Sequence, residues 1–161
     1  MRTELIGLPK HATSSNPIIL EDNFNNSYAV YRAVNNNNKV FFYYITDEER
    51  GLHPRCDYLL VCNDDCSVRF IELKGADILS GMDCCKNAWG HAFHQLIATY
   101  YEYVELIDSE NDEVKMILCT SVSRASRKRS ATSYKKYKYY KQIQELGIIP
   151  QILYCDDEDV V

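Results

Sequence analysis

The 161-residue chain has no apolar run near the roughly 18 residues that a membrane span requires. Its first ten residues, MRTELIGLPK, also lack the apolar segment of a secretory signal. Apolar residues make up 46% of the chain and charged residues 25%, which is typical of a soluble globular protein. We therefore expect a cytoplasmic protein that folds as a single domain over residues 1–161, with no membrane partner.

A CxxC pair is also missing, although the chain holds seven cysteines. An odd number of cysteines, several of them inside apolar segments, predicts free thiols in a reducing compartment rather than a disulfide framework. His91 and His94 could be combined with Cys84 and Cys85 as zinc ligands. An adjacent cysteine pair chelates poorly, however, and the spacing fits no known finger, so we do not expect zinc.

Acidic residues are absent from residues 114–144, although the whole chain carries a net charge of −5. This window contains nine of the eighteen Lys and Arg residues, and such asymmetry can place a basic patch on an acidic protein. Basic side chains neutralise phosphates, and the tyrosines of the same window could stack on bases. The predicted nucleic-acid-binding residues are Arg124, Arg127, Lys128, Arg129, Lys135, Lys136 and Lys138. The alternative is a buried stripe of Tyr137, Tyr140 and Ile143 with lysines that only maintain solubility.

The most informative stretch is PRCDYLLVCNDDCSVRFIELKG, residues 54–75. Residues 68–74 alternate in character, so Glu72 and Lys74 are expected on one face of a strand and apolar side chains on the other. Residues 56–62 form a second apolar run, and the polar residues 63–65 between the two runs are typical of a turn. The pattern predicts an antiparallel hairpin that brings Asp57 close to Glu72.

Two carboxylates beside an amine are suited to a hard divalent cation. Mg²⁺ and Mn²⁺ prefer oxygen ligands, and Lys74 would be placed to orient or polarise a metal-bound water. The alternative is a solvated Glu–Lys pair on an exposed strand, which is a common arrangement without function. The position of the pair at the end of a strand, immediately before Gly75, favours a site.

These residues resemble the PD-(D/E)XK nuclease superfamily, with Asp57 as the aspartate and Glu72-Leu73-Lys74 as the (D/E)XK triplet. Cys56 stands where the superfamily's name has proline. The segments CDYLLV and RFIELKGADI, followed by HQLIAT, are also similar to a group of small bacterial proteins of that superfamily.

The resemblance implies a restriction-endonuclease-like α/β core, with a mixed sheet of about 4–5 strands flanked by helices. It implies a Mg²⁺- or Mn²⁺-dependent nuclease, with Asp57, Glu72, Lys74 and Gln95 as catalytic residues and Glu21 as an additional metal ligand. The expected partner is nucleic acid, with DNA favoured over RNA, and a role in bacterial defence or mobile-element conflict would fit. The resemblance leaves open whether the protein forms a homo-oligomer.

The rest of the chain supplies the remaining predicted elements. Residues 1–16 are expected to be a loosely held lead-in, and the acidic tail 156–159 to be exposed. The pattern of residues 17–34 fits a helix or a strand, and we favour a helix. The further predicted elements are a strand at 39–46, a long helix at 83–108, a strand at 113–120 parallel to the strand before the helix, a helix that ends at Gly147, and an edge strand at 148–155.

Two other functions stay open at this point. A non-catalytic module that binds nucleic acid or a protein partner could keep a nuclease-like fold, although intact Asp57, Glu72 and Lys74 argue against a degraded site. A structural or regulatory protein that uses its acidic surface has only composition in its favour.

Overall fold

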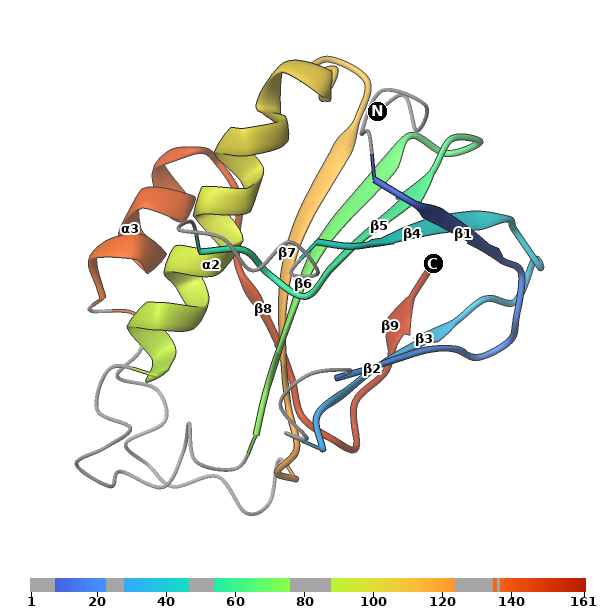
Figure 1. Cartoon of the computed structure of the whole chain (residues 1–161), viewed down its shortest axis with the longest axis horizontal. Helices are drawn as coiled ribbons and strands as arrows, with labels where there is room; N and C mark the ends of the chain where they lie inside the picture. Colours follow the sequence, from blue (N-terminus) through green and yellow to red (C-terminus); the bar gives the residue numbers. More distant parts are fainter. Residues whose placement is uncertain (1–7, 23–27, 47–53, 76–87, 124–134, 136) are drawn as a thin grey trace.

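A computed structural model of the chain describes residues 8–22, 28–46, 54–75, 88–123, 135 and 137–161. Its centre is a six-stranded sheet in the order β1-β4-β5-β6-β7-β8 (Figure 1). The strands are β1 Lys10–Thr13, β4 Phe41–Ile45, β5 Tyr58–Cys62, β6 Ser67–Lys74, β7 Glu113–Thr120 and β8 Gln151–Leu153. A second sheet has the order β2-β3-β9, with β2 Ile18–Glu21, β3 Val30–Val34 and β9 Asp159–Val160.

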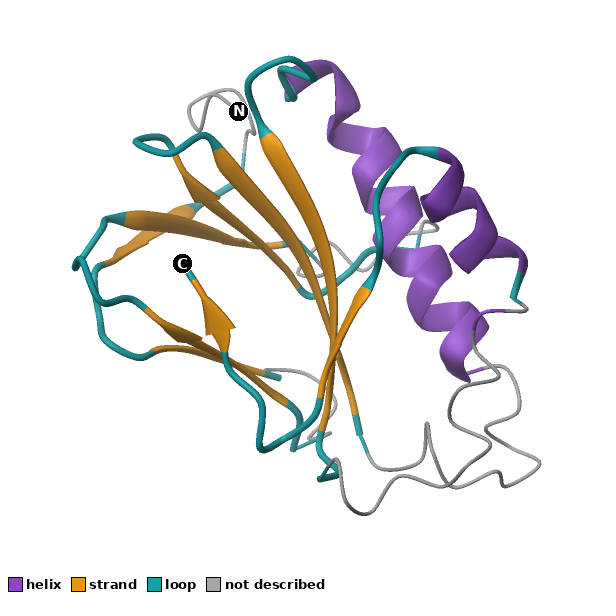
Figure 2. Ribbon diagram, turned by 180° about the vertical axis from the view of Figure 1, so that it is seen from behind, coloured by secondary structure: helices purple, strands orange, loops and turns teal. Residues whose placement is uncertain are grey.

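Three layers result from the two faces of the central sheet. Helices α2 (Ala88–Tyr103) and α3 (Lys138–Glu145) lie side by side on one face, and the small sheet lies on the other (Figures 1 and 2). One buried cluster joins Leu59 and Phe70 to the helices, and a second joins Leu60 and Ile71 to the small sheet. Because adjacent strand residues point to opposite faces, both faces of β5 and β6 are buried.

The predicted hairpin and crossover are confirmed. Strands β4, β5 and β6 are sequential antiparallel neighbours, and β6 pairs in parallel with β7 after the passage through α2. β8 is an edge strand, as predicted, and pairs in parallel with β7. The α/β class with a mixed sheet is therefore confirmed, with six strands in the main sheet instead of about 4–5.

The predicted helix over residues 17–34 is wrong, because the described residues of this range form the antiparallel pair β2–β3. Ile18 and Leu20 are buried while Ile19 and Glu21 are exposed, which is the period of two that a strand requires. These strands cover the second apolar face of the central sheet, which the sequence pattern alone did not show to need a partner.

Two predictions at the ends of the chain are wrong in part, since Asp156 and Glu158 are exposed as expected. Residues 10–13 of the expected lead-in form β1, which pairs with β4. The end of the expected exposed tail forms β9, which pairs in parallel with β3. Asp159 is 3% exposed because its charge is neutralised by a cation from the central sheet.

Helix α2 agrees with the predicted amphipathic helix, of which residues 83–87 lie outside the described part of the chain. A short 3-10 helix, η3 (Val104–Leu106), continues it. α3 confirms the predicted helix before Gly147, which has a φ of +78° that glycine adopts readily. No helix within the described ranges is long and apolar enough to cross a membrane.

Candidate active site

The two central carboxylates lie at the open end of the β5–β6 hairpin. Tyr58 pairs with Ile71 in this hairpin, so the register continued by one residue sets Asp57 opposite Glu72. Asp57 Oδ2 accepts a hydrogen bond of 2.6 Å from the backbone N–H of Leu73. Glu72 alternates with Ile71 and therefore lies on the helix-covered face of β6, like Phe70.

Glu72 and Lys74 form an ion pair on this face. The Nζ of Lys74 lies 2.6 Å from Oε1 of Glu72, whose side chain is 1% exposed, whereas that of Lys74 is 23% exposed. A buried carboxylate requires a charge partner, since its removal from water costs several kcal/mol. The structure thus places the amine at the solvent side of a buried acid.

Helix α2 holds the segment that precedes Asp57 through three side chains on one helical face. Gln95 Nε2 donates a hydrogen bond of 2.9 Å to the carbonyl oxygen of Arg55, and the backbone N–H of Cys56 donates one of 2.8 Å to Thr99 Oγ1. Glu102 forms an ion pair with the guanidinium of Arg55. The spacing of four and three residues puts these side chains on one side of the helix, so α2 fixes the backbone from which Asp57 projects.

The thiol of Cys56 shows how the local charges act. Burial, and then the negative charge of Glu72, raise the pKa of this thiol to about 12. The thiol consequently stays protonated at neutral pH and is a poor nucleophile. Cys56 is a packed residue beside the candidate site and not its reactive group.

The oxygens at this end of the sheet fit Mg²⁺ chemistry. Mg²⁺ is usually held by one or two carboxylates, with water and substrate phosphate as the other ligands. Asp57 and Glu72 supply two carboxylates, and Gln95 Oε1 is a buried acceptor that has no hydrogen-bond partner among the described residues. Within the described ranges, no three His, Cys, Asp or Glu side chains are arranged to bind a metal by themselves.

Glu21 is not brought to this pair. It is the last residue of β2, and its side chain lies on the exposed face of the small sheet. That sheet covers the face of the central sheet opposite to Glu72. Glu21 was expected as an additional ligand because the resemblance implies one in this part of the chain, and the helix favoured for residues 17–34 is absent from the described residues of the range.

The predicted nucleic-acid-binding residues are only partly described. Arg124, Arg127, Lys128, Arg129 and Lys136 lie outside the described residues, as do Cys84 and Cys85 of the rejected zinc set. Lys135 and Lys138 are exposed just before and at the start of α3.

Sequence reasoning missed Arg55, Thr99 and Glu102, which position the segment before Asp57. The available signal was the row of polar side chains along α2, at residues 95, 99 and 102, next to its apolar stripe. The identity of their partners depends on how α2 lies on the sheet. No protein-family model matches the chain, and neither a curated protein nor a solved structure matches it significantly.

Proposed function

We propose that the chain is a metal-dependent nuclease that hydrolyses phosphodiester bonds at the site formed by Asp57, Glu72 and Lys74. The carrying observation is the ion pair of the buried Glu72 with the partly exposed Lys74, opposite Asp57 at the end of the hairpin. A divalent cation bound by the two carboxylates would polarise the phosphoryl oxygen and lower the pKa of an attacking water.

Each residue has a distinct part in this proposal. Asp57 and Glu72 bind the cation, and Lys74 stabilises negative charge on the phosphoryl group or orients the water. Gln95 is a positioning residue, since its amide holds the carbonyl of Arg55 two residues before Asp57. Lys135 and Lys138 would contact substrate phosphates together with Arg124, Arg127, Lys128, Arg129 and Lys136. DNA is favoured over RNA as the substrate.

A second candidate function, a binding module without catalysis, is favoured by two contacts. Asp57 Oδ2 accepts the Leu73 N–H, and Glu72 is neutralised by Lys74, so both carboxylates also stabilise the hairpin. If the two carboxylates served only to stabilise the hairpin, the protein would bind nucleic acid through its basic segment without cleaving it.

The decisive experiment measures cleavage of plasmid, linear duplex, single strands and RNA with Mg²⁺, with Mn²⁺ and with EDTA. Asp57→Asn and Glu72→Gln keep the size of the side chains and remove their charges. Loss of several kcal/mol of transition-state stabilisation corresponds to a decrease in rate of at least about 100-fold. Asp64→Asn, in the exposed turn of the same hairpin, is the matched control and should cleave normally.

Circular dichroism and nucleic-acid affinity separate chemistry from folding. A folded Glu72→Gln variant that binds like the wild type and does not cleave would support the proposal. Equal cleavage in EDTA, or full activity of either variant, would contradict the two-carboxylate site. Binding without any cleavage by the wild type would favour the binding module.

A further inference from the structure

A cavity of about 310 Å³ lies between the two helices on the face that carries Glu72. It is lined by Gly90, His91 and His94 of α2 and by Tyr137, Lys138 and Tyr139 at the start of α3. Its volume is at the lower end of the range for ligand pockets, about 300–1,000 Å³. This volume corresponds to one small ligand and is far smaller than a double helix.

Gly90 permits the close approach that shapes this cavity. A Cβ atom at position 90 would lie 3.2 Å from Cδ1 of Tyr137, which is tighter than ordinary contact. The ring of Tyr137 therefore rests directly on the backbone of α2. This contact accounts for a glycine inside a helix, where it costs about 1 kcal/mol relative to alanine.

The walls of the cavity combine aromatic rings with positive charge. The rings of His94 and Tyr139 are stacked, with centroids 4.2 Å apart and an interplanar angle of 9°. The Nζ of Lys138 lies 5.6 Å from the centroid of Tyr139. Among the residues that the structure describes, none of the side chains that line the cavity is a carboxylate. A flat ligand that carries negative charge is complementary to such walls.

The cavity is close to the candidate active site. His91 lines the cavity and precedes Gln95 by four residues on α2, so the two side chains lie on one face of the helix. Gln95 in turn donates a hydrogen bond to the carbonyl oxygen of Arg55, two residues before Asp57. A ligand in the cavity would thus lie about one helical turn from the side chain that holds the segment before Asp57.

We propose that this cavity binds one unpaired nucleobase, stacked against the His94–Tyr139 pair, with its phosphate near Lys138. The inference deepens the proposed nuclease function and rests on it for the claim that the bound nucleotide lies next to the cleaved bond. In a duplex both faces of a base are covered by its neighbours, so a stacking pocket selects an unpaired nucleotide. The substrate class is therefore single-stranded or locally unpaired nucleic acid.

The affinity of the protein for a short labelled oligo(dT), an oligo(U) and a duplex is measured by fluorescence anisotropy. The measurement is made in EDTA, which prevents metal-dependent cleavage. Wild-type protein should bind the single strands more tightly than the duplex. Tyr139→Leu keeps apolar volume without the ring and should weaken single-strand binding by about 5- to 150-fold, the effect of losing one base–aromatic stack. Tyr139→Phe keeps the ring and should restore binding.

Matched controls come from the same two helices. Tyr101→Leu alters a tyrosine of α2 that is 55% exposed and lies outside the cavity, so it should leave affinity unchanged. Lys138→Gln should weaken binding more than Lys141→Gln, since Lys141 is exposed on α3 and does not line the cavity. Circular dichroism establishes that each variant is folded.

Three results would each overturn the inference: equal affinity of folded Tyr139→Leu and wild type, equal weakening by Tyr139→Phe and Tyr139→Leu, or binding of the duplex as tight as that of the single strands. The nuclease proposal fails by a different measurement, namely cleavage that does not depend on Glu72. If the protein binds single strands through Tyr139 but cleaves no nucleic acid, the proposed binding pocket stands and the proposed nuclease activity is refuted.

Discussion

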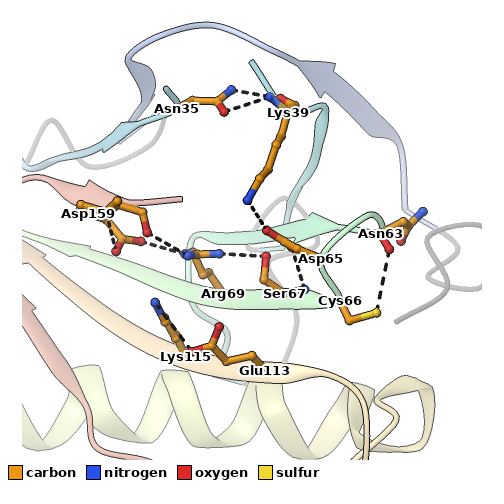
Figure 3. A network of polar contacts seen from close by, with 11 residues as sticks. Asn35, Lys39, Asn63, Asp65, Cys66, Ser67, Arg69, Glu113, Lys115 and Asp159 are labelled. Carbon is orange, nitrogen blue, oxygen red and sulfur yellow. Dashed lines mark hydrogen bonds and ion pairs between the residues drawn. The ribbon is translucent and has the colours of Figure 1, made fainter. Parts of the chain in front are cut away.

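Asp159 should be one of the main determinants of the protein's stability. Asp159 in β9 lies between two side chains of other strands, Arg69 of β6 and Tyr31 of β3. Its Oδ2 accepts hydrogen bonds of 2.7 Å from Arg69 Nε and 2.8 Å from the Tyr31 hydroxyl. Figure 3 shows the contact between Arg69 and Asp159, with Arg69 also donating a hydrogen bond to Ser67 Oγ. This network joins the small sheet to the central one.

Replacement Asp159→Asn keeps the shape of the side chain and removes its charge. The guanidinium of Arg69, which is 3% exposed, would then be buried without its carboxylate partner. Breaking a buried ion pair by removing one partner costs about 3–5 kcal/mol. The free energy of unfolding of a small domain is about 5–15 kcal/mol, so this substitution should remove a large share of it.

Urea denaturation at pH 7, followed by far-UV circular dichroism, measures the effect. The midpoint should fall while the dependence of the unfolding free energy on urea stays constant. Glu158→Gln changes an exposed neighbour and should shift stability by less than about 0.5 kcal/mol. The double replacement Arg69→Met/Asp159→Leu should destabilise less than Asp159→Asn alone, because no charge is left buried. A loss below about 1 kcal/mol for Asp159→Asn would refute the reasoning.

Three further predictions concern titratable groups. Iodoacetamide should modify the exposed Cys155 in the native protein and leave the buried Cys56, Cys62 and Cys119 unmodified. Burial raises the pKa of these three thiols, so little reactive thiolate is present. Peptide mapping that finds rapid modification of Cys56 would contradict this. Burial, and then the charge of Asp159, raise the pKa of Tyr31 well above 10. The contribution of Tyr31 to stability is therefore present below pH 10 and is lost as pH rises beyond that value. In urea titrations at increasing pH, Tyr31→Phe should lose less unfolding free energy above pH 10 than the wild type. Burial opposes ionisation of Asp65, but hydrogen bonds from Lys39 and Ser67 outweigh it and lower the pKa to about 2. The stability from Asp65 is therefore present above about pH 4 and lost between about pH 4 and pH 2, and Asp65→Asn should abolish that part of the acid transition, by less than about 1 kcal/mol because the pair with Lys39 is partly exposed to solvent.

The sequence alone determined the central hairpin and the crossover. Residues 68–74 alternate in side-chain character, and the turn at 63–65 is short, so the antiparallel pairing of β5 with β6 followed from local chemistry. The helical period after Gly75 predicted α2, and a helix between two apolar strands predicted parallel pairing with β7. The placement of Glu72 and Lys74 on one face needed only the alternation of a strand.

The small sheet could not be predicted in the same way. β3 pairs with β9 across more than a hundred residues, and neither strand is long enough to show a strong period. Acidic residues at the end of a chain are usually exposed, and Asp159 is buried only because Arg69 reaches it from another strand. The sequence showed both charges and gave no sign that they meet.

The surroundings of the candidate site were likewise decided by tertiary structure. Local pattern placed Gln95 near the apolar stripe of its helix, whereas its contact with the carbonyl of Arg55 depends on how α2 lies on the sheet. The cavity beside Tyr139 forms where Tyr137, the residue before α3, packs against Gly90 of α2. Short-range periodicity thus fixed which side chains share a strand or a helix face, and long-range packing, which no local pattern encodes, fixed which faces meet.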